Sequence, residues 1–189
     1  NEIRGTITKL EEVVTGSGSD TVTANSLEIR NIDLGAGNDT LRYSTTLNLE
    51  LYISTNTIIN KDDAAQKVNA VRIENFILGS GDDMVDTGAN ETAYNVKTGI
   101  GSDVVYYRGY KAIIDGEGGT DKIYIGYDES IPNNPIDAAE YLKIDSTGKG
   151  IVTNSSYNQI GGTFSNFEIL EDYNGDNQLI NYNYGGLMN

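Results

Sequence analysis

The sequence of 189 residues contains no cysteine, no histidine and no tryptophan. Without cysteine the chain cannot form disulfides or thiolate zinc sites, although this alone does not fix its compartment. Without histidine it lacks the side chain that most often binds transition metals and most often acts as a general base. These absences exclude a disulfide framework and weigh against histidine-dependent catalysis.

Basic residues are also scarce, because 13 lysines and arginines face 28 acidic residues and give a net charge of −15. A nucleic-acid backbone or an anionic membrane surface requires basic patches, so neither is an expected partner. No apolar run approaches ~18 residues, so we expect no membrane insertion. With 22 glycines, a chain this acidic is expected to repel itself until cations arrive and to favour disorder without metal. The beginning, Asn-Glu-Ile-Arg, has no Met and does not resemble a signal peptide, so we expect a piece of a longer protein.

Glycine and aspartate recur in a fixed pattern of a six-residue turn followed by a short strand. In residues 78–86 (LGSGDDMVD), Gly79 and Gly81 allow the backbone to bend, Asp83 points into the turn, and Val85 enters the core. The pattern recurs from residues 15, 34 and 98, and a fifth copy from residue 116 keeps the fourth-position Gly, the sixth-position Asp and the eighth-position aliphatic residue. The sixth-position aspartates are Asp20, Asp39, Asp83, Asp103 and Asp121.

This pattern resembles the calcium-binding nonapeptide G-G-x-G-x-D-x-U-x of the haemolysin-type (RTX) family, over residues 15–123 and more weakly over 164–180. A single G-x-G-x-D would carry little weight because Gly and Asp dominate ordinary turns. Five copies, each with an aliphatic residue two places after Asp, favour the calcium motif over plain turns of a β-solenoid. The resemblance implies a right-handed parallel β-roll, several Ca²⁺ ions bridging successive turns, and type I secretion. Four copies depart from the motif at the first position, and Glu117 replaces the second Gly of the fifth.

The resemblance assigns metal ligands to the sixth-position aspartates and to glycines whose turns carry inward carbonyl oxygens. The glycines are Gly16, Gly18, Gly35, Gly37, Gly79, Gly81, Gly99, Gly101, Gly116 and Gly119. Stacked parallel strands would bring equivalent carboxylates to ~4.8 Å, where they repel unless cations lie between them. Calcium accepts six to eight oxygen ligands in loose geometry and suits such a column better than magnesium. Weaker metal candidates are Asp63 and the group Asp172, Asn174 and Asp176, which begins like an EF-hand loop but has Asn177 and Asn183 at its sixth and twelfth positions.

The spacings between the five aspartates are 19, 44, 20 and 18 residues. Because these are about twice nine, we expect the five turns to stack on one edge, with eroded turns such as residues 87–91 on the other. Strands leading into the turns are predicted at residues 10–15, 29–34 and 73–78. The long gap predicts an extra coil over residues 42–70, with Leu47, Leu49, Leu51 and Ile53 alternating on a half-buried strand and a turn at residues 58–63.

The pattern breaks after residue 127. Residues 141–145 and 151–154 flank a Gly-rich turn and predict a β-hairpin. Residues 164–169 resemble another lead-in strand, and residues 172–179 a weaker turn. We therefore predict one continuous all-β domain, with a calcium-binding parallel β-roll at 1–127, an insertion with a hairpin packed on it at 128–163, and a degenerate final coil with a C-terminal cap at 164–189.

The predicted function is a calcium-dependent structural module of a secreted bacterial surface protein, of the adhesin or S-layer type, joined to neighbouring domains or subunits. One alternative is a glycan- or peptide-binding module built from the 128–160 insertion and the tyrosines, ten of whose thirteen follow residue 105, although Tyr also suits exposed strands. Another is the accessory roll of a secreted enzyme. The chain itself has no histidine zinc motif and no G-x-S-x-G nucleophile motif, so we do not expect it to be an enzyme.

Overall fold

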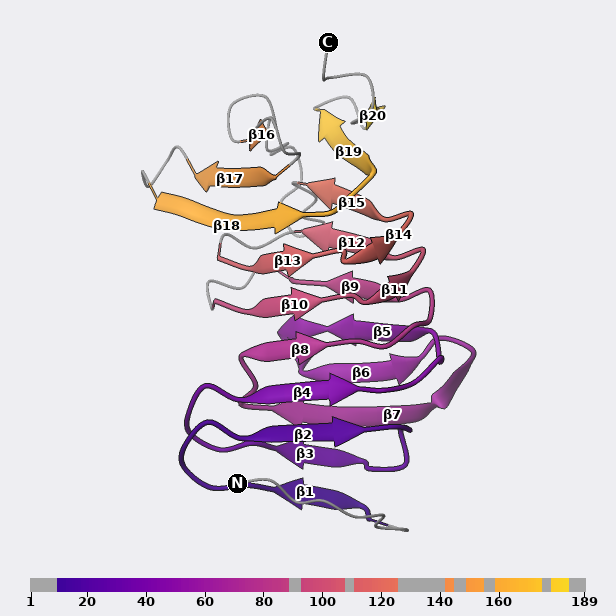
Figure 1. Ribbon diagram of the computed structural model, residues 1–189, viewed down its shortest axis with the longest axis vertical. Helices are drawn as coiled ribbons and strands as arrows, with labels where there is room; N and C mark the ends of the chain where they lie inside the picture. Colours follow the sequence, from indigo (N-terminus) through magenta and orange to yellow (C-terminus); the bar gives the residue numbers. More distant parts are fainter. Residues whose placement is uncertain are drawn as a thin grey trace.

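Two large sheets make up the chain in a computed structural model that describes residues 10–88, 93–107, 111–125, 142–144, 149–154, 159–174 and 178–183 (Figure 1). Most neighbouring strands are parallel, and the all-β class predicted from the sequence is confirmed. The ten-stranded sheet contains, in spatial order, β1 (Glu12–Val14), β3 (Asn31–Asp33), β7 (Asp63–Val71), β6 (Thr57–Asn60), β5 (Leu49–Tyr52), β9 (Met84–Asp86), β12 (Val104–Tyr107), β15 (Lys122–Ile125), β19 (Ile169–Asn174) and β20 (Gln178–Asn183).

The eight-stranded sheet lies in front of the ten-stranded sheet in Figure 1. It contains β16 (Leu142–Ile144), β17 (Gly150–Asn154), β18 (Gln159–Ser165), β13 (Ile113–Asp115), β10 (Asn95–Lys97), β8 (Asn75–Ile77), β4 (Thr40–Tyr43) and β2 (Thr21–Ala24). A short third sheet pairs β11 (Ile100–Gly101) with β14 (Gly118–Gly119), and one 3-10 turn, η1 (Ile53–Thr55), follows β5. Among the described residues no helix is long and apolar enough to cross a membrane.

The chain alternates between the two large sheets, and each strand pairs with its equivalent one repeat later. Val22 pairs with Leu41, and Val105 pairs with Val85 on one side and with Ile123 on the other. These registers correspond to the aspartate spacings of 19, 20 and 18 residues. The repeat unit read from the sequence is therefore the unit that stacks, and the three predicted lead-in strands form as β1, β3 and β8.

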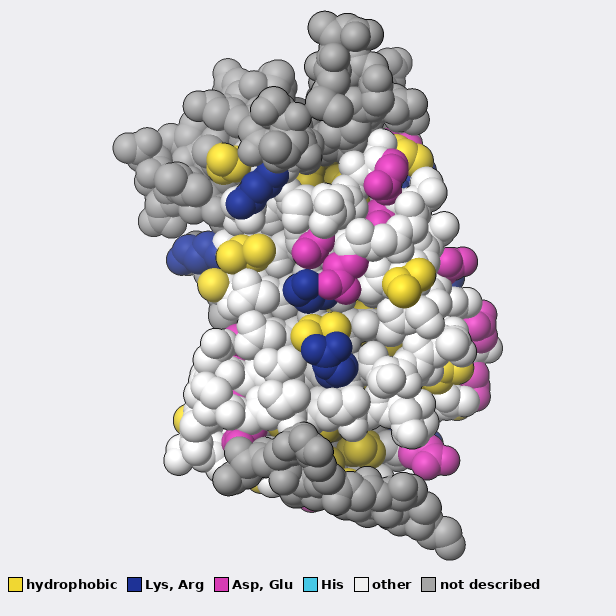
Figure 2. Space-filling view, in the orientation of Figure 1, with side chains coloured by type: hydrophobic (Ala, Val, Ile, Leu, Met, Phe, Trp, Pro, Cys, Tyr) yellow, Lys and Arg dark blue, Asp and Glu magenta, His cyan; other side chains and the backbone are white. Residues whose placement is uncertain are grey.

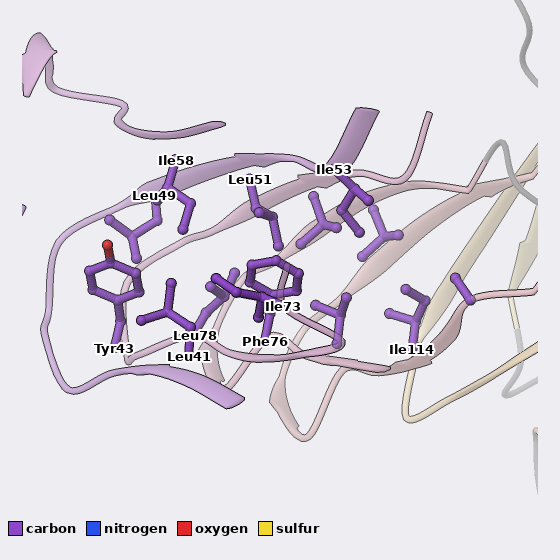
Figure 3. Close-up of a cluster of buried hydrophobic side chains, with 14 of the residues drawn as sticks. Leu41, Tyr43, Leu49, Leu51, Ile53, Ile58, Ile73, Phe76, Leu78 and Ile114 are labelled. Carbon is purple, nitrogen blue, oxygen red and sulfur yellow. The ribbon is translucent and has the colours of Figure 1, made fainter. Parts of the chain in front are cut away.

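The core lies between the two sheets and is filled by the aliphatic residues that follow the turns (Figure 3). Leu41, Val85, Val105 and Ile123, each two places after a turn aspartate, are fully buried. Because side chains alternate along a strand, this position faces the opposite sheet while its neighbours face outward. Burying one such side chain contributes about 1.5–3 kcal/mol. In Figure 2 the outward face of the eight-stranded sheet is mostly uncharged and polar, and acidic side chains gather toward the right edge.

The extra coil predicted over residues 42–70 is wrong in part. Leu49 and Leu51 alternate inward on β5 and Ile53 is buried after it, as expected. The predicted coil turn at residues 58–63 is instead the reversal between β6 and β7, which pair antiparallel within the ten-stranded sheet. The Asn60 side chain accepts the amide hydrogen of Asp62 at 3.0 Å and closes this reversal, so a tight hairpin forms where no glycine supports a wider turn.

The prediction that all five turns stack on one edge is also wrong. The turns at 15–20 and 34–39 lead from the ten-stranded to the eight-stranded sheet, whereas those at 78–83, 98–103 and 116–121 lead back. In Figure 1 the second group lies on the right, where β11 and β14 are labelled, and the first group lies on the left. Between residues 39 and 83 the chain makes one and a half circuits plus a hairpin, so the turns change edge.

At the C-terminal end, β16 and β17 pair antiparallel and confirm the predicted hairpin. β18 returns to the repeat pattern and pairs parallel to β13. The weaker turn predicted at residues 172–179 is wrong at both of its ends, because residues 172–174 belong to β19 and residues 178–179 to β20, and these strands pair antiparallel. Residues 175–177 lie outside the described residues.

Candidate metal site in the turn columns

Acidic residues at equivalent positions of successive turns form two columns, one on each edge of the sheets. The Asp39 column consists of Asp20, Asp39 and Glu74. The Asp103 column consists of Asp83, Asp103, Asp121 and Glu168. The strand registers define these positions, since each acidic residue lies two places before a residue that pairs with its counterpart in the next strand.

A ladder of hydrogen bonds runs through the Asp103 column. The amide nitrogen of Asp83 donates to Oδ1 of Asp103 at 2.7 Å, and that of Asp103 donates to Oδ1 of Asp121 at 2.9 Å. The ladder begins at the amide of Leu49, which donates to Asp83 Oδ1 at 2.7 Å, and ends at Oε2 of Glu168, which accepts from Asp121 at 2.7 Å. Each carboxylate therefore satisfies the backbone of the turn before it.

The Asp39 column repeats this arrangement over fewer turns. The amide of Asp20 donates to Asp39 Oδ1 at 2.7 Å, and the amide of Asp39 donates to Oε2 of Glu74 at 2.8 Å. A turn amide and the carboxylate of the next turn thus form the same contact on both edges. The sixth-position aspartates have a structural role in the fold whether or not a metal is bound.

The second carboxylate oxygen of four aspartates is buried and receives no hydrogen bond from any described residue. Among the described residues, Oδ2 of Asp39, Asp83, Asp103 and Asp121 makes no hydrogen bond, and the side chains are at most 1% exposed. A buried carboxylate oxygen without a donor costs free energy, of about 1–3 kcal/mol or more for a charged group. These oxygens are the polar atoms of the columns that the described residues leave without a hydrogen bond.

Burial shifts the pKa of these carboxyl groups upward in the Asp103 column. Loss of solvent raises the pKa of Asp83 to about 7, with the Asp103 charge adding to the shift. It also raises the pKa of Asp103, and it raises that of Asp121 to about 6, with the charges of Asp103 and Glu168 contributing. In contrast, the hydroxyl of Thr15 hydrogen-bonds Asp20 and lowers its pKa.

The turn glycines predicted as ligands are explained first by close packing between turns. A Cβ atom added at eight of them would lie 1.5–2.2 Å from a carbonyl oxygen of the neighbouring turn. The eight are Gly35, Gly37, Gly79, Gly81, Gly99, Gly101, Gly116 and Gly119. Gly16 and Gly18, in the first turn, have no described heavy atom within 4 Å of such a Cβ.

Four carbonyl oxygens of the turn glycines form hydrogen bonds between successive turns. The carbonyl oxygens of Gly16, Gly79, Gly99 and Gly101 accept amide hydrogens from the next turn, at 3.0, 3.2, 2.9 and 3.2 Å. Each such oxygen keeps one lone pair. These four glycine carbonyls therefore link successive turns by hydrogen bonds. The aspartate Oδ2 atoms, which have no such partner among the described residues, are the oxygens best placed to accept a cation.

Sequence reasoning missed Glu74 and Glu168 as members of the columns. Both end a short corner whose first residue has a left-handed backbone, Arg72 with φ 57° and Asn166 with φ 58°. The corners lack the glycines of the motif, which hid them. A signal was nevertheless present, because each glutamate has an apolar residue two places later, Phe76 or Leu170, as every turn aspartate does.

The donor set fits a hard cation such as calcium, since it consists of carboxylate and carbonyl oxygens. It does not form a cage of many acids, because no group of three or more His, Cys, Asp or Glu side chains suited to a metal occurs within the described part of the chain.

The weaker candidate Asp63 is not in either column, is exposed, and accepts hydrogen bonds from Ala65 N and Gln66 Nε2. Asp172 and Asn174 lie in β19, while Asp176 and the side chains of all three lie outside the described residues.

No family model matches this chain, and no curated protein matches it either. The likeness to the RTX motif therefore depends on the five turns themselves and on the columns they form.

Proposed function

We propose that this chain is a calcium-stabilised structural module of a secreted bacterial surface protein, built as a right-handed parallel β-roll of the RTX type. The observation that carries the proposal is the set of four buried aspartate oxygens that have no hydrogen-bond donor in the described part of the chain. They lie in two columns whose rungs are successive turns, which is where the motif would bind its ions.

The electrostatics of a column favour a bound cation. Adjacent strands are ~4.8 Å apart, so two charged rungs repel by about 3.5 kcal/mol at an effective dielectric of 20. Without a cation, the buried carboxyl groups must take up protons or remain charged at a cost in stability, and the raised pKa values of Asp83 and Asp121 reflect this. A divalent cation between rungs would supply the missing partner for Oδ2 and would leave intact the hydrogen bond that Oδ1 accepts from the amide of the neighbouring turn.

The residues that would hold calcium are the five turn aspartates, assisted by the turn glycine carbonyls. When bound, calcium would supply positive charge and oxygen coordination between turns. The chain's own residues have three further roles. Oδ1 of Asp39, Asp83, Asp103 and Asp121 accepts a backbone amide hydrogen of the preceding turn. Glycine permits close stacking of the turns, and the aliphatic residue anchors the next strand in the core. Because the columns exist only in the folded chain, cation binding would stabilise folding directly.

This linkage suits a protein exported through a type I secretion channel. The acidic chain would remain unfolded at the low calcium concentration of the cytosol and fold in the calcium-rich medium outside the cell. As a rigid module of an adhesin or S-layer protein, it would connect neighbouring domains or subunits.

Circular dichroism during calcium titration tests the proposal. In excess chelator the strand signal should collapse or its thermal midpoint should fall strongly, and calcium should restore it, whereas magnesium at equal concentration should restore it poorly. A strand signal and a midpoint that are the same in chelator and in millimolar calcium would overturn the proposed function.

A second candidate function is a calcium-scaffolded module that binds a glycan or a peptide. The observation that favours it is the stacked pair Tyr106 and Tyr124, on the outer face of the ten-stranded sheet, with ring centroids 5.0 Å apart and planes at 9°. Glycan-array and cell-binding assays with the whole chain, against a variant lacking residues 128–160, would separate this function from a purely structural one.

A further inference from the structure

We infer that Glu74 and Glu168 complete two further calcium sites, one at the end of each column, in which Glu74 acts with Asp39 and Glu168 acts with Asp121. This inference depends on the proposed function, because it extends the cation columns to residues that the nonapeptide motif does not contain. It concerns only where the columns end and how many ions they hold.

The two ends are built alike although they lie on opposite edges. Each is a short corner with a left-handed residue, a buried apolar residue and a glutamate: Arg72, Ile73 and Glu74 in one, and Asn166, Phe167 and Glu168 in the other. The corner is shorter than the six-residue turn below it. The longer side chain of Glu bridges the difference and brings Oε2 to 2.8 Å from the Asp39 amide and 2.7 Å from the Asp121 amide.

Each glutamate accepts the backbone amide hydrogen of an aspartate whose own Oδ2 has no donor among the described residues. Asp39 is 0% exposed and Asp121 is 1% exposed, and Oδ2 of both lacks a hydrogen-bond donor among the described residues. Each pair therefore combines two acidic side chains with one buried oxygen that nothing in the described chain satisfies.

The end pairs differ from the interior rungs in their access to water. Glu168 is exposed and Glu74 is half-buried, whereas Asp83 and Asp103 are buried. A cation at an end pair can keep some of its water and exchange with solvent more readily than one between two aspartate turns. We expect calcium at the end sites to exchange with solvent faster than calcium bound between two aspartate turns.

A purely structural reading is that each glutamate only caps the last turn amide. The variants Glu74→Gln and Glu168→Gln separate the two readings, because the glutamine side-chain oxygen can still accept the amide hydrogen of Asp39 or Asp121 but carries no charge. Isothermal titration calorimetry of the whole chain with calcium measures the number of ions bound. We expect each variant to bind one ion fewer than the wild type and the double variant two fewer, with the strand signal retained in calcium.

Glu28→Gln is the matched control, since Glu28 is exposed and lies outside both columns, and it should leave the ion count unchanged. If the ion counts of both column variants equal that of the wild type, the two glutamates are caps only and the inference is wrong. If the wild type itself binds no calcium, the proposed function fails instead.

A measurement on the wild type covers the case in which a variant does not fold. With glutamate labelled at the side-chain carboxyl carbon, NMR late in the calcium titration, after the strand signal is complete, should report two glutamate signals that still shift. Calcium binding with no shifted glutamate signal would overturn the inference while leaving the proposed function intact.

Discussion

The Asp39 and Asp103 columns share one sequence motif and one hydrogen-bond ladder but differ in their electrostatics. In the Asp103 column three consecutive aspartates are buried between neighbouring turns, and burial raises the pKa of all three. In the Asp39 column the first turn lies at the end of the stack, and Thr15 lowers the pKa of its Asp20. The same local sequence thus has different chemistry in the two places, because desolvation dominates the pKa of the three buried aspartates whereas the Thr15 side chain dominates that of Asp20.

The largest expected difference between the columns concerns glycine at the second turn position. A Cβ at Gly79 would lie 2.1 Å from the carbonyl oxygen of Thr45, whereas one at Gly16 meets no described heavy atom within 4 Å. Neither glycine has a positive φ, so backbone strain does not confuse the comparison. Gly79→Ala should lower the free energy of unfolding by about 3 kcal/mol, and Gly16→Ala should change it by less than about 0.5 kcal/mol.

Chemical denaturation in calcium measures both glycine variants. Equal destabilisation by the two substitutions would mean that the first turn is packed as tightly as an interior turn, and the distinction between the end and the interior of a column would be lost.

The next effect in size is the response of the aspartates to loss of charge. Asp103→Asn keeps an oxygen to accept the Asp83 amide hydrogen but removes the buried charge. In calcium it should lower the free energy of unfolding by about 2 kcal/mol, because a ligand is lost. In excess chelator it should stabilise the chain by about 1 kcal/mol, because it removes a buried negative charge whose Oδ2 has no donor among the described residues.

Asp20→Asn is the matched variant at the end of the other column. Its carboxylate has a lowered pKa, so the folded state favours the charged form, and the substitution should destabilise the chain modestly in both conditions. Urea unfolding of both variants, with calcium and with chelator, checks the predicted change of sign. If Asp103→Asn were destabilising to the same extent in chelator, the view of Oδ2 as an unsatisfied oxygen would be wrong.

The sequence predicted which residues form the individual turns, but it did not predict on which edge of the sheets each turn lies. The motif identified Asp83, Val85 and their equivalents because turn, carboxylate and core position all lie within eight residues. The edge of each turn depends instead on how many times the chain crosses between sheets. A spacing of 44 residues fits two coils as well as it fits one and a half coils with a hairpin, and only strand pairing distinguishes them.

The ends of the columns were hidden for a similar reason. Glu74 and Glu168 replace Asp in corners without glycine, and their equivalence is visible only when Phe76 pairs with Leu41 and Leu170 with Ile123. A longer acidic side chain on a shorter corner reaches the same amide. A sequence motif of fixed length misses this replacement of an Asp turn by a shorter Glu corner. The pairing register of the strands reveals it.

A smaller effect is the pH dependence of stability in the absence of calcium. Asp83 and Asp121 have folded-state pKa values of about 7 and about 6, above the ordinary value of 3.8. The folded chain therefore binds more protons than the unfolded chain between pH ~4 and ~7, and stability should fall as the pH rises through this window, by at most ~1.4 kcal/mol per pH unit for each group. The lowered pKa of Asp20 acts in the opposite direction, because its contribution is lost as the pH falls below the ordinary value.

Thermal unfolding in chelator from pH 4.5 to 7.5, a window set by those pKa values, measures this dependence. Asp83→Asn should flatten the decline and Asp20→Asn should not. Stability that rises across the window in the wild type would show that the Asp103 column is not desolvated as described.

The smallest expected effect comes from ion pairs on the surface beside each column. Lys97 Nζ lies 2.6 Å from Oε1 of Glu117 near the Asp103 column, and Arg72 pairs with Asp33 near the Asp39 column. The cationic partners are 46% and 59% exposed, so solvent and salt screen both pairs. Lys97→Gln and Arg72→Gln should each cost less than about 1 kcal/mol and leave the calcium ion count unchanged. Loss of a bound ion in either variant, measured by calorimetry, would mean that charge outside the columns also determines cation binding, since neither side chain contributes an oxygen ligand.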